Sequence, residues 1–536
     1  MESLRFLKPN VVIEPLFNRW YAWSHLVSPA TAAMNITGRH LKIMNSYVQS
    51  PNIHAAAVKN PQMLGGPFMD YPSPKVREIE ELRMQTIKRC EDPIAFAKAV
   101  IDLDNMLKNW SKGFSLEPVY EKVPGILKGY VELVYDLNNN PSFRFFETLL
   151  YRSNFYSEKS QSIALWVTNN DERPFVLSTP KLNDPNVIHL DIPFNSPVID
   201  NLARMKRTAG NIEAIRTAMQ IPSALTSLFE SFFTAEAPPR YEKYQGDKIR
   251  MRYFGHACIL IETLDVSILV DPLISYYGYF SKIEHYSDVD LPDKIDYVLI
   301  THNHQDHVLL ETLLPLRHKI RNIVVPKGGN GSLQDPSLKL MLQEIGFENV
   351  LELGELETIR FRDCHITGIP FMGEHCDLNI PTKICHHVNF FQFSVLLAAD
   401  SCNVEPRLYD HVQKIIGNID IIFLGMECLG APLTWLYGPL LSQELPRDKD
   451  SSRRLSGSNY ERGRSLINAF NPKEVYVYAM GLEPWLEFIS SIRYSPDSYP
   501  MAQSGKLIEE LNSRGITAER LFGEKELLYE KVMTLS

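Results

Sequence analysis

One six-residue segment constrains the fold of this 536-residue chain more than any other feature. The segment HNHQDH follows the apolar run DYVLIT (296–301) and places His302, His304, Asp306 and His307 directly after a predicted strand. The first two imidazoles project to the same side of an extended segment, because side chains alternate along a strand. The three imidazoles are borderline metal donors and the carboxylate is a hard one. Four such donors are more than a single tetrahedral metal site takes from so short a stretch. The segment therefore predicts a loop that holds two metal ions close together.

A polar loop that is rich in histidine by chance, or a cluster that caps the following helix at 309–316, is the alternative interpretation. Three of the chain's 15 histidines fall within this short segment, however, which makes chance a poor explanation. Donors of these types at this spacing are typical of metal sites. We therefore interpret the segment as a metal-binding loop.

Composition and charge exclude several classes of protein. Hydrophobic residues make up 44% of the chain and charged residues 22%, so neither a disordered nor a fibrous chain is expected. Acidic side chains outnumber basic ones by 64 to 55, and this balance argues against binding to nucleic acid. Seven scattered cysteines without a CxxC pair indicate a reducing, cytoplasmic compartment. The apolar runs are too short to span a bilayer and the amino terminus lacks a signal-peptide core, so we expect a soluble protein without a membrane partner.

The chain divides at a linker-like stretch. Residues 234–246 combine two adjacent prolines, charges and a glycine without a periodic apolar pattern. We expect an α+β amino-terminal domain at 1–240 and a second domain at 247–536. In the first domain, the patterns predict helices at about 73–89, 92–110 and 197–219, and strands at 162–168, 175–178 and 187–194.

The second half has a different pattern of predicted strands and helices. Short strand-type runs, from RYFGHACILIET (252–263) to EVYVYAM (474–480), alternate with amphipathic helices at 338–347 and 505–515. Many strands with helices between and after them predict sheets layered against helices.

HNHQDH after a strand, with YFGHACILIETLDVSILVDP upstream and LLAAD downstream, resembles the metallo-β-lactamase fold. In that fold, an HxHxDH motif supplies ligands to a dinuclear metal site. The resemblance covers about 247–536 and implies an αββα sandwich with the metals at one edge. It also implies that Asp400 bridges the metals and that Asp271 is a buried structural residue. His256, in the GHA turn, is expected to pack or to contact a ligand rather than to bind metal.

Two departures from the hydrolytic members of this fold are informative. Those members usually add one histidine to each metal, yet no histidine follows His411 here. The other region reads PFMGEHCDLNI and offers both Glu374 and His375. Adjacent residues on an extended segment point to opposite sides, so we expect only one of them, Glu374, to reach the metal. A shell of three imidazoles and three carboxylates favours iron and dioxygen over zinc.

With these departures, the chain is similar to the diiron β-hydroxylase family of chloramphenicol biosynthesis. That resemblance implies two iron ions, dioxygen as co-substrate and an external electron donor. It assigns His302, His304 and Glu374 to one iron, Asp306 and His307 to the other, and Asp400 to both. Glu374 and Asp400 are also the residues expected to take part in catalysis.

The same resemblance implies the substrate and the partners. The family hydroxylates the β-carbon of an amino acid that is held as a thioester on the peptidyl carrier domain of a nonribosomal peptide synthetase. We therefore expect that carrier domain and an electron-donor protein as partners. The large amino-terminal half is expected to dock a partner or a second copy of the chain in a homodimer.

Two other functions compete with this one. A dizinc hydrolase of a thioester, lactone or phosphodiester would use His375 in place of Glu374 and a metal-bound hydroxide as nucleophile. A binding protein without catalysis could also retain the fold, although the intact HNHQDH segment argues against it. Iron or zinc in the purified protein distinguishes the two enzymes.

Several further residues have an ordinary structural explanation. Glu427 follows a buried-type strand and could orient a ligand, contact the substrate amine or make a structural hydrogen bond. Trp435, Tyr437 and Trp485 are expected to pack, as are His386 and His387. The basic cluster Arg204, Lys206 and Arg207 is expected to form a solvated helix face.

Overall fold

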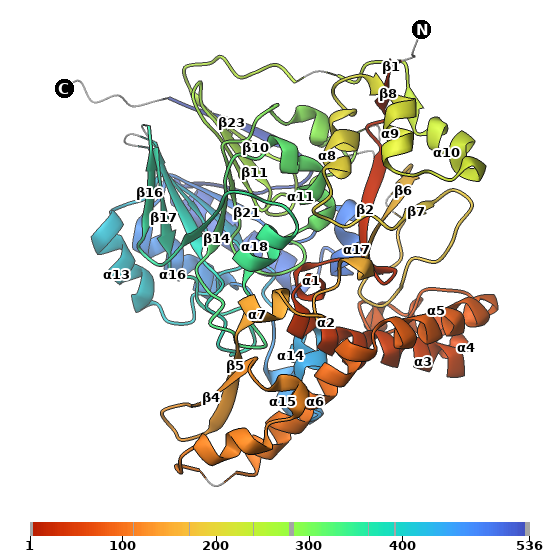
Figure 1. Cartoon of the computed structure of the whole chain (residues 1–536). Helices are drawn as coiled ribbons and strands as arrows, with labels where there is room; N and C mark the ends of the chain where they lie inside the picture. Colours follow the sequence, from red (N-terminus) through yellow and green to blue (C-terminus); the bar gives the residue numbers. More distant parts are fainter. Residues whose placement is uncertain are drawn as a thin grey trace.

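The computed structural model describes residues 4–110, 112–170, 172–239, 241–277, 283–362, 364–390 and 393–530. Two seven-stranded sheets form the centre of the molecule, and helices cover the outer face of each sheet. This is the predicted αββα sandwich, preceded by an α+β amino-terminal half (Figure 1). No helix among the described residues is long and apolar enough to cross a membrane.

The first sheet has the strand order β15-β14-β13-β12-β11-β10-β23. Strands β12 to β15 pair in parallel, whereas β10, β11 and β23 pair antiparallel. Helices α11 (Leu310–Leu316) and α12 (Leu338–Glu344) follow β13 and β14 along the chain. The strands are β10 (Ile249–Tyr253), β11 (Ile259–Glu262), β12 (Ser267–Val270), β13 (Tyr297–Leu299), β14 (Ile323–Pro326), β15 (Val350–Leu353) and β23 (Lys525–Tyr529).

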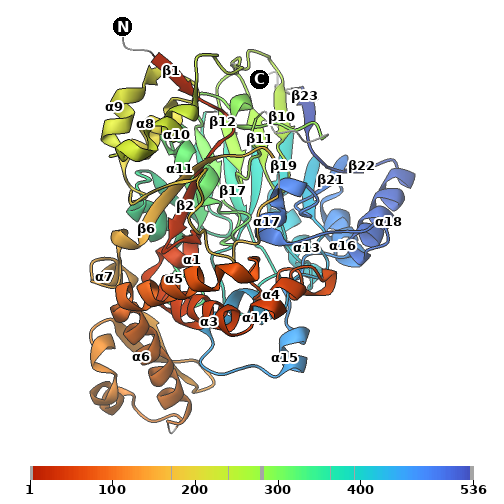
Figure 2. The same ribbon diagram turned by 90° about the vertical axis from the view of Figure 1, so that its right-hand side faces the viewer.

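The second sheet has the order β16-β17-β18-β19-β20-β21-β22. Its strands are β16 (Thr358–Phe361), β17 (Cys364–Ile369), β18 (Cys385–Phe390), β19 (Phe393–Leu397), β20 (Ile421–Gly425), β21 (Glu474–Tyr478) and β22 (Thr517–Arg520). The helices of this part of the chain are α13 (Arg407–Ile416), α14 (Leu433–Tyr437), α15 (Arg447–Ser452), α16 (Tyr460–Phe470), α17 (Glu487–Ser490) and α18 (Tyr499–Ser513). Figure 2 shows α13, α16 and α18 together on the outer side of this sheet.

Side chains that alternate along each strand divide the apolar core into layers. In β11, Ile259 and Ile261 belong to the core between the sheets, and Leu260 belongs to the core on the outer face. A strand in which every residue is buried by one layer or the other reads as a continuous apolar run. This explains why the strand-type runs of the second half are recognisable in the sequence.

The amino-terminal half contains short sheets and many helices. Its strands are β1 (Leu4–Leu7), β2 (Val11–Phe17), β3 (Trp20–Tyr21), β4 (Val131–Tyr135), β5 (Pro141–Phe145), β6 (Gln161–Val167), β7 (Ile188–Leu190), β8 (Gly210–Asn211) and β9 (Phe233–Thr234). Its helices are α1 (Ser24–Val27), α2 (Pro29–Asn35), α3 (Leu41–Gln49), α4 (Pro51–Ala57), α5 (Val76–Arg89), α6 (Glu91–Lys108), α7 (Glu147–Tyr151), α8 (Pro197–Arg204), α9 (Ile212–Ala218) and α10 (Thr226–Ser231). Both views place α3 to α6 along one end of the sandwich and α8 to α10 beside α11 (Figures 1 and 2).

The two halves share one continuous core. Apolar residues of β2, such as Val11 and Ile13, cluster with Leu310, Leu313 and Leu314 of α11. Arg173 joins the halves by a bidentate ion pair to Glu311, at 2.9 and 2.8 Å. The division into 1–240 and 247–536 stays a prediction, although no strand or helix lies between β9 and β10 in the described residues.

Three sequence-based expectations for the first half need correction. Residues 175–178 do not form a strand, and 176–178 form a turn. The strand predicted at 187–194 is shorter and spans only Ile188–Leu190. The helix predicted at 197–219 is broken, because β8 pairs with β1 and the Asn211 side chain caps a new helix by accepting from the Ala214 N–H.

Arg317 is a buried link between the halves, and its loss is expected to destabilise the protein. Its guanidinium pairs with Asp200 at 3.1 Å and donates to the Phe194 and Ser196 carbonyls at 2.6 and 3.0 Å. We expect Arg317→Ala to lower the free energy of unfolding by about 3 kcal/mol, because Asp200 and the carbonyls lose their partner. Thermal melting measures this effect.

Arg321→Ala provides the matched control for this prediction. Its side chain is 58% exposed and lies 3.8 Å from Asp296, so its loss is expected to change stability by less than about 1 kcal/mol. Equal melting temperatures for the two variants would contradict the assignment of Arg317.

Candidate metal centre

A buried carboxylate, that of Asp271, contacts both ends of the HNHQDH loop and holds it in place. Asp271 follows β12, is fully buried, and accepts from the Thr301 backbone N–H at 2.8 Å and from its hydroxyl at 2.6 Å. Its Oδ2 also lies 2.8 Å from His307 Nδ1. Parallel strands β12 and β13 end at the same edge of the sheet, so the loop and the carboxylate that holds it meet there. The Asp271 contact directs the other ring nitrogen of His307 toward the centre.

His302, His304 and Glu374 form one corner of the centre. One ligand atom from each lies within 4.8 Å of the other two, and all three residues are buried. His304 Nδ1 is 2.9 Å from Glu374 Oε1, and His302 Nε2 is 4.0 Å from Glu374 Oε2. These three side chains could hold one metal ion.

A second corner lies on the other side of Asp400. His256, Asp306 and His307 form a second group of donors with the same spacing, and His256 Nε2 lies 3.2 Å from Asp306 Oδ2. Asp306 is the most open of these, since 23% of its side chain is exposed. The centre is therefore more accessible on the Asp306 side.

Asp400 stands between the two corners. Its Oδ2 is 3.2 Å from His307 Nε2 and 3.7 Å from His302 Nε2. The residue follows β19 in a tight turn in which Ala399 has a φ of 44°. A Cβ at Gly425, on the adjacent strand, would stand 2.8 Å from Asp400 Oδ1, so the close approach of this carboxylate requires glycine there.

The GEHCD loop differs from the extended segment assumed from the sequence. Gly373, Glu374, Cys376 and Asp377 have φ values of 79°, 68°, 54° and 57°, so the chain turns back on itself. As a result, Glu374 and His375 lie on the same side: Glu374 Oε2 is 2.8 Å from His375 Nδ1, and the His375 ring is 4.6 Å from that of His304. The argument that only one of these two residues can reach the metal is therefore wrong, and the choice of Glu374 as the ligand stays a prediction.

The charges of the protein groups favour a cation at this position. Burial lowers the pKa of His302 well below its ordinary value, and the His307 imidazole lowers it further. Burial acts against a charged His307, but Asp400 and Asp271 raise the pKa of His307 well above its ordinary value. Burial alone would raise the pKa of Glu374, but His304 and His375 hold it well below the ordinary value. The centre therefore concentrates carboxylate charge.

The donor set fits metal ions, and unpaired polar atoms support this. His302 Nε2 and Asp400 Oδ1 are buried without a hydrogen-bond partner among the described residues. A buried polar atom without a partner is costly, and a metal ion satisfies such atoms. Three imidazoles and three carboxylates, with His256 close by, provide the hard and borderline donors that iron accepts.

The structure brings together all six residues predicted from the sequence, and it adds others. His256 contacts Asp306, one of the six predicted ligands, at 3.2 Å. The Tyr437 hydroxyl is 3.4 Å from His304 Nε2, although packing was expected for it. From the amino-terminal half, the Ser24 hydroxyl donates to Asn303 within the HNHQDH loop. No signal in the sequence connects such distant residues.

Other residues singled out in the sequence have different roles. The His386 ring lies 2.9 Å from the Ile300 carbonyl oxygen, so it supports the strand before the loop. Glu427 follows β20, and burial together with the Asp400, Asp306 and Glu374 carboxylates raises its pKa well above the ordinary value. Glu427 is therefore close enough to the centre for these carboxylates to act on it.

Two family models match the chain. The model of the diiron non-heme beta-hydroxylase N-terminal domain matches residues 6–238. The model of the beta-lactamase superfamily domain matches residues 250–377.

The similar proteins cover different shares of the chain. The 4-amino-L-phenylalanyl CmlP-peptidyl-carrier-protein 3-hydroxylase of Streptomyces venezuelae is 38% identical over 523 residues, which cover 96% of this chain and 98% of that protein. The crystal structure of CmlA, a diiron beta-hydroxylase from Streptomyces venezuelae, matches with a TM-score of 0.91 at 37% identity, over 98% of this chain and 99% of that chain. A UPF0173 protein of Pyrococcus abyssi is 44% identical over 131 residues, only 24% of this chain and 50% of that protein.

Replacement of Asp271 is expected to disorganise the loop without removing any of the six predicted ligands. Asp271→Asn places an amide N–H against donors of Thr301 or His307 and removes charge-assisted hydrogen bonds. We expect the free energy of unfolding to fall by about 2 to 3 kcal/mol, measured by thermal melting.

Asp265→Asn is the control for this replacement, because its carboxylate is 59% exposed in an ion pair with Arg362. This change is expected to stay within about 0.5 kcal/mol of the unchanged protein. A normal melting temperature for Asp271→Asn would refute the central role of this carboxylate.

Proposed function

Because this chain belongs to the diiron non-heme β-hydroxylase family, we propose that its substrate is an aminoacyl thioester on a peptidyl carrier domain. The family assignment rests on 38% identity over 96% of the chain. The chain is thus an oxygen-dependent diiron hydroxylase, as the HNHQDH and GEHCD segments predicted. The alternatives of a dizinc hydrolase and of a binding protein without catalysis are set aside.

The proposed ligands are the six residues predicted from the sequence. His302, His304 and Glu374 hold one iron, and Asp306 and His307 hold the other. Asp400 binds both, and the support for this is its position within 3.7 Å of both His302 Nε2 and His307 Nε2. On this proposal, His256 orients Asp306, and Asp271 keeps the His307 proton on Nδ1 so that Nε2 is free to bind.

The iron ions supply the chemistry of dioxygen activation, and the protein residues position the groups around it. Hydroxylation inserts one oxygen atom into a C–H bond and reduces the other to water, which consumes two electrons and two protons. Those electrons require an external donor, and we propose an electron-donor protein. Glu374 and Asp400 are the proposed catalytic residues, because both are carboxylates of the centre: Glu374 belongs to one corner, and Asp400 lies between the two corners.

The proposed partner is a nonribosomal peptide synthetase that carries the amino acid. The Streptomyces venezuelae relative acts on a 4-amino-L-phenylalanyl group on a peptidyl carrier protein. By analogy, we propose that residues 1–240 form the domain that docks the carrier or a second copy of the chain, and that 247–536 form the catalytic domain. A cytoplasmic location agrees with seven cysteines that are all free and buried.

Iron content tests the ligand assignment. We expect two iron ions per chain, a loss of about one in Glu374→Gln, and no loss in His375→Gln. The physical reason is that a carboxylate stabilises ferric iron better than an amide does. Elemental analysis with Mössbauer spectra measures both the amount and the environment of the iron.

The pair Glu374→Gln and His375→Gln is matched, since both residues are buried in the same loop. A loss of iron in His375→Gln alone would reverse the assignment. Stoichiometric zinc that supports activity in the unchanged protein would overturn the proposed iron centre.

The substrate class is tested with the chemically reduced protein. It is given dioxygen and a panel of aminoacyl-loaded carrier domains, free amino acids and simple thioesters, and the products are weighed by mass spectrometry. We expect a gain of one oxygen atom on carrier-bound substrates and much less on the others. Release of the acyl group without oxidation would contradict the proposal.

A further inference from the structure

The GEHCD loop, residues 373–377, has an unfavourable backbone conformation. Glu374, Cys376 and Asp377 have left-handed φ values of 68°, 54° and 57°. A Cβ makes this conformation unfavourable, and residues that adopt it persist only where surrounding contacts hold them. Because the conformation turns Glu374 and His375 to the same side, the contacts that hold the loop also determine which side chains face the metal centre.

The loop packs directly on the segment that follows Asp400. The Cys402 N–H donates to the Met372 carbonyl at 2.8 Å, and a Cβ on Gly373 would stand 2.6 Å from the Cβ of Cys402. This close approach requires glycine, which also suits the φ of 79° at this position. The contact fixes the start of the loop, and the carbonyl groups further along it are held by other partners.

Lys383 holds the first carbonyl of the loop. Its ammonium donates to the Gly373 carbonyl at 3.0 Å, and the same oxygen accepts from the His375 N–H at 2.9 Å. Lys383 is partly buried, and its ammonium lies 5.8 Å from the centre of the Phe371 ring. Burial lowers the pKa of Lys383 and the Glu374 carboxylate acts in the opposite direction, so the two charges are close enough to stabilise each other.

Backbone contacts fix the position of Lys383 itself. Its backbone pairs with that of His302 in an antiparallel bridge. The preceding residue, Thr382, is fully buried and donates to Asp335 from its N–H at 3.2 Å and from its hydroxyl at 2.9 Å. Lys383 therefore connects the two segments that provide His302 and Glu374, which are proposed ligands of the same iron.

Arg453 holds the other end of the loop. Its Nε donates to the Cys376 carbonyl at 2.9 Å. The Arg453 carbonyl in turn accepts from the Leu433 N–H at 2.9 Å, where α14 begins. Two cations thus donate to the backbone carbonyls on either side of Glu374 and His375.

We propose that Lys383 and Arg453 are positioning residues that hold the GEHCD loop in the conformation that presents Glu374 to the metal centre. This inference rests on the proposed function, because it takes Glu374 as an iron ligand. Without the Lys383 ammonium, the Gly373 carbonyl loses a charged donor and Glu374 loses a nearby positive charge. The loop then relaxes from its left-handed conformation, and the Glu374 carboxylate withdraws from its iron.

Hydrogen exchange measures directly how firmly the loop is held. The full-length protein is studied with and without iron, and exchange is followed in peptides that cover 371–378, where the His375 and Leu378 amides are hydrogen-bonded. We expect Lys383→Met and Arg453→Gln each to speed exchange in this segment about tenfold and to leave the strands of both sheets unchanged. Lys383→Arg is expected to restore slow exchange, because a guanidinium can donate to the same carbonyl.

Spectra and kinetics connect the loop to the iron. Lys383→Met is expected to change the Mössbauer parameters of one iron and to leave the other unchanged, because only one corner of the centre includes Glu374. Its kcat for an aminoacyl carrier substrate is expected to fall about tenfold, with KM changed by less than about twofold, because the loop holds a ligand and not the substrate. Lys383→Arg should recover most of kcat.

Two matched controls accompany these variants. Arg454 follows Arg453 in the chain and donates from Nε to the Gly430 carbonyl at 2.8 Å, a hydrogen bond of the same kind outside the GEHCD loop. The Lys339 ammonium pairs with Glu352 at 3.0 Å, on α12. We expect Arg454→Gln and Lys339→Met to leave the loop exchange, the iron spectra and kcat unchanged.

The contrary outcomes are distinct. Unchanged loop exchange in either Lys383→Met or Arg453→Gln, or equal changes at both irons in Lys383→Met, would overturn the inference while the proposed function stands. If the unchanged protein contains no iron or oxidises no carrier-bound substrate, the proposed function itself fails. The exchange measurement on the iron-free protein then still decides whether the two cations hold the loop.

Discussion

The contact between Asp271 and the HNHQDH loop is the constraint on which the centre depends. One carboxylate that is removed from water accepts from the Thr301 backbone and hydroxyl and lies 2.8 Å from His307 Nδ1. Asp271 therefore holds the chain where β13 ends and the loop begins. It also orients the His307 imidazole. A buried carboxylate is tolerated only when donors surround it, so the loop and the carboxylate stabilise each other.

The amino-terminal half contributes directly to this arrangement. Ser24 reaches Asn303 inside the loop, and Arg173 pairs with Glu311 one turn beyond it. The first half therefore covers the outer face of the first sheet and completes the core that begins at α11. This explains why a metallo-β-lactamase sandwich is joined to such a large additional half in a single continuous core.

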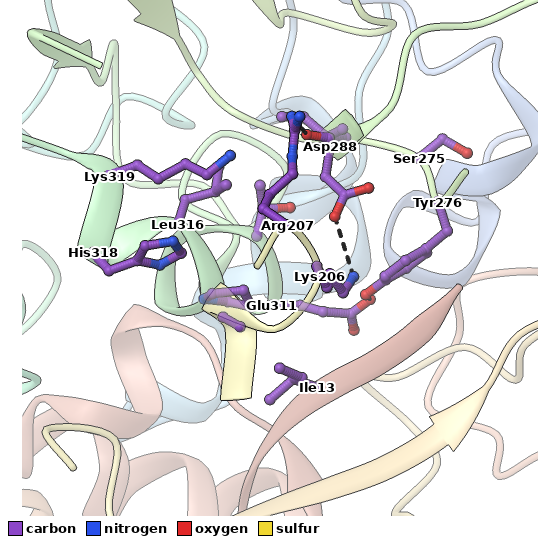
Figure 3. A pocket seen from close by; sticks show the side chains of 14 residues that line it. Ile13, Lys206, Arg207, Ser275, Tyr276, Asp288, Glu311, Leu316, His318 and Lys319 are labelled. Atoms are coloured by element: carbon purple, nitrogen blue, oxygen red, sulfur yellow. Dashed lines mark hydrogen bonds and ion pairs between the residues drawn. The ribbon is translucent and has the colours of Figure 1, made fainter. Parts of the chain in front are cut away.

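The sequence predicted the sandwich and the set of residues that meet at its edge, because both depend on local patterns. Strands buried on both faces are continuous apolar runs, and HNHQDH places four donors within one loop. What it could not predict depends on distant contacts and on backbone geometry. The left-handed φ of Glu374 brings His375 to the same side, and the pairing of β8 with β1 breaks a helix. Lys206, which looks like a surface residue in the sequence, is buried and contacts Pro9 and, as Figure 3 shows, Asp288.

The unequal exposure of the centre has a stereochemical consequence. His302 and His307 have fully buried side chains, whereas 23% of the Asp306 side chain remains exposed. A substrate that enters from the Asp306 side meets a rigid wall of imidazoles and carboxylates beyond it. Asymmetric surroundings of this kind distinguish the two hydrogens of a prochiral carbon. Such a centre therefore favours one diastereomer of a β-hydroxy product, and the handedness is set by how the protein holds the substrate and not by the chemistry of the bond.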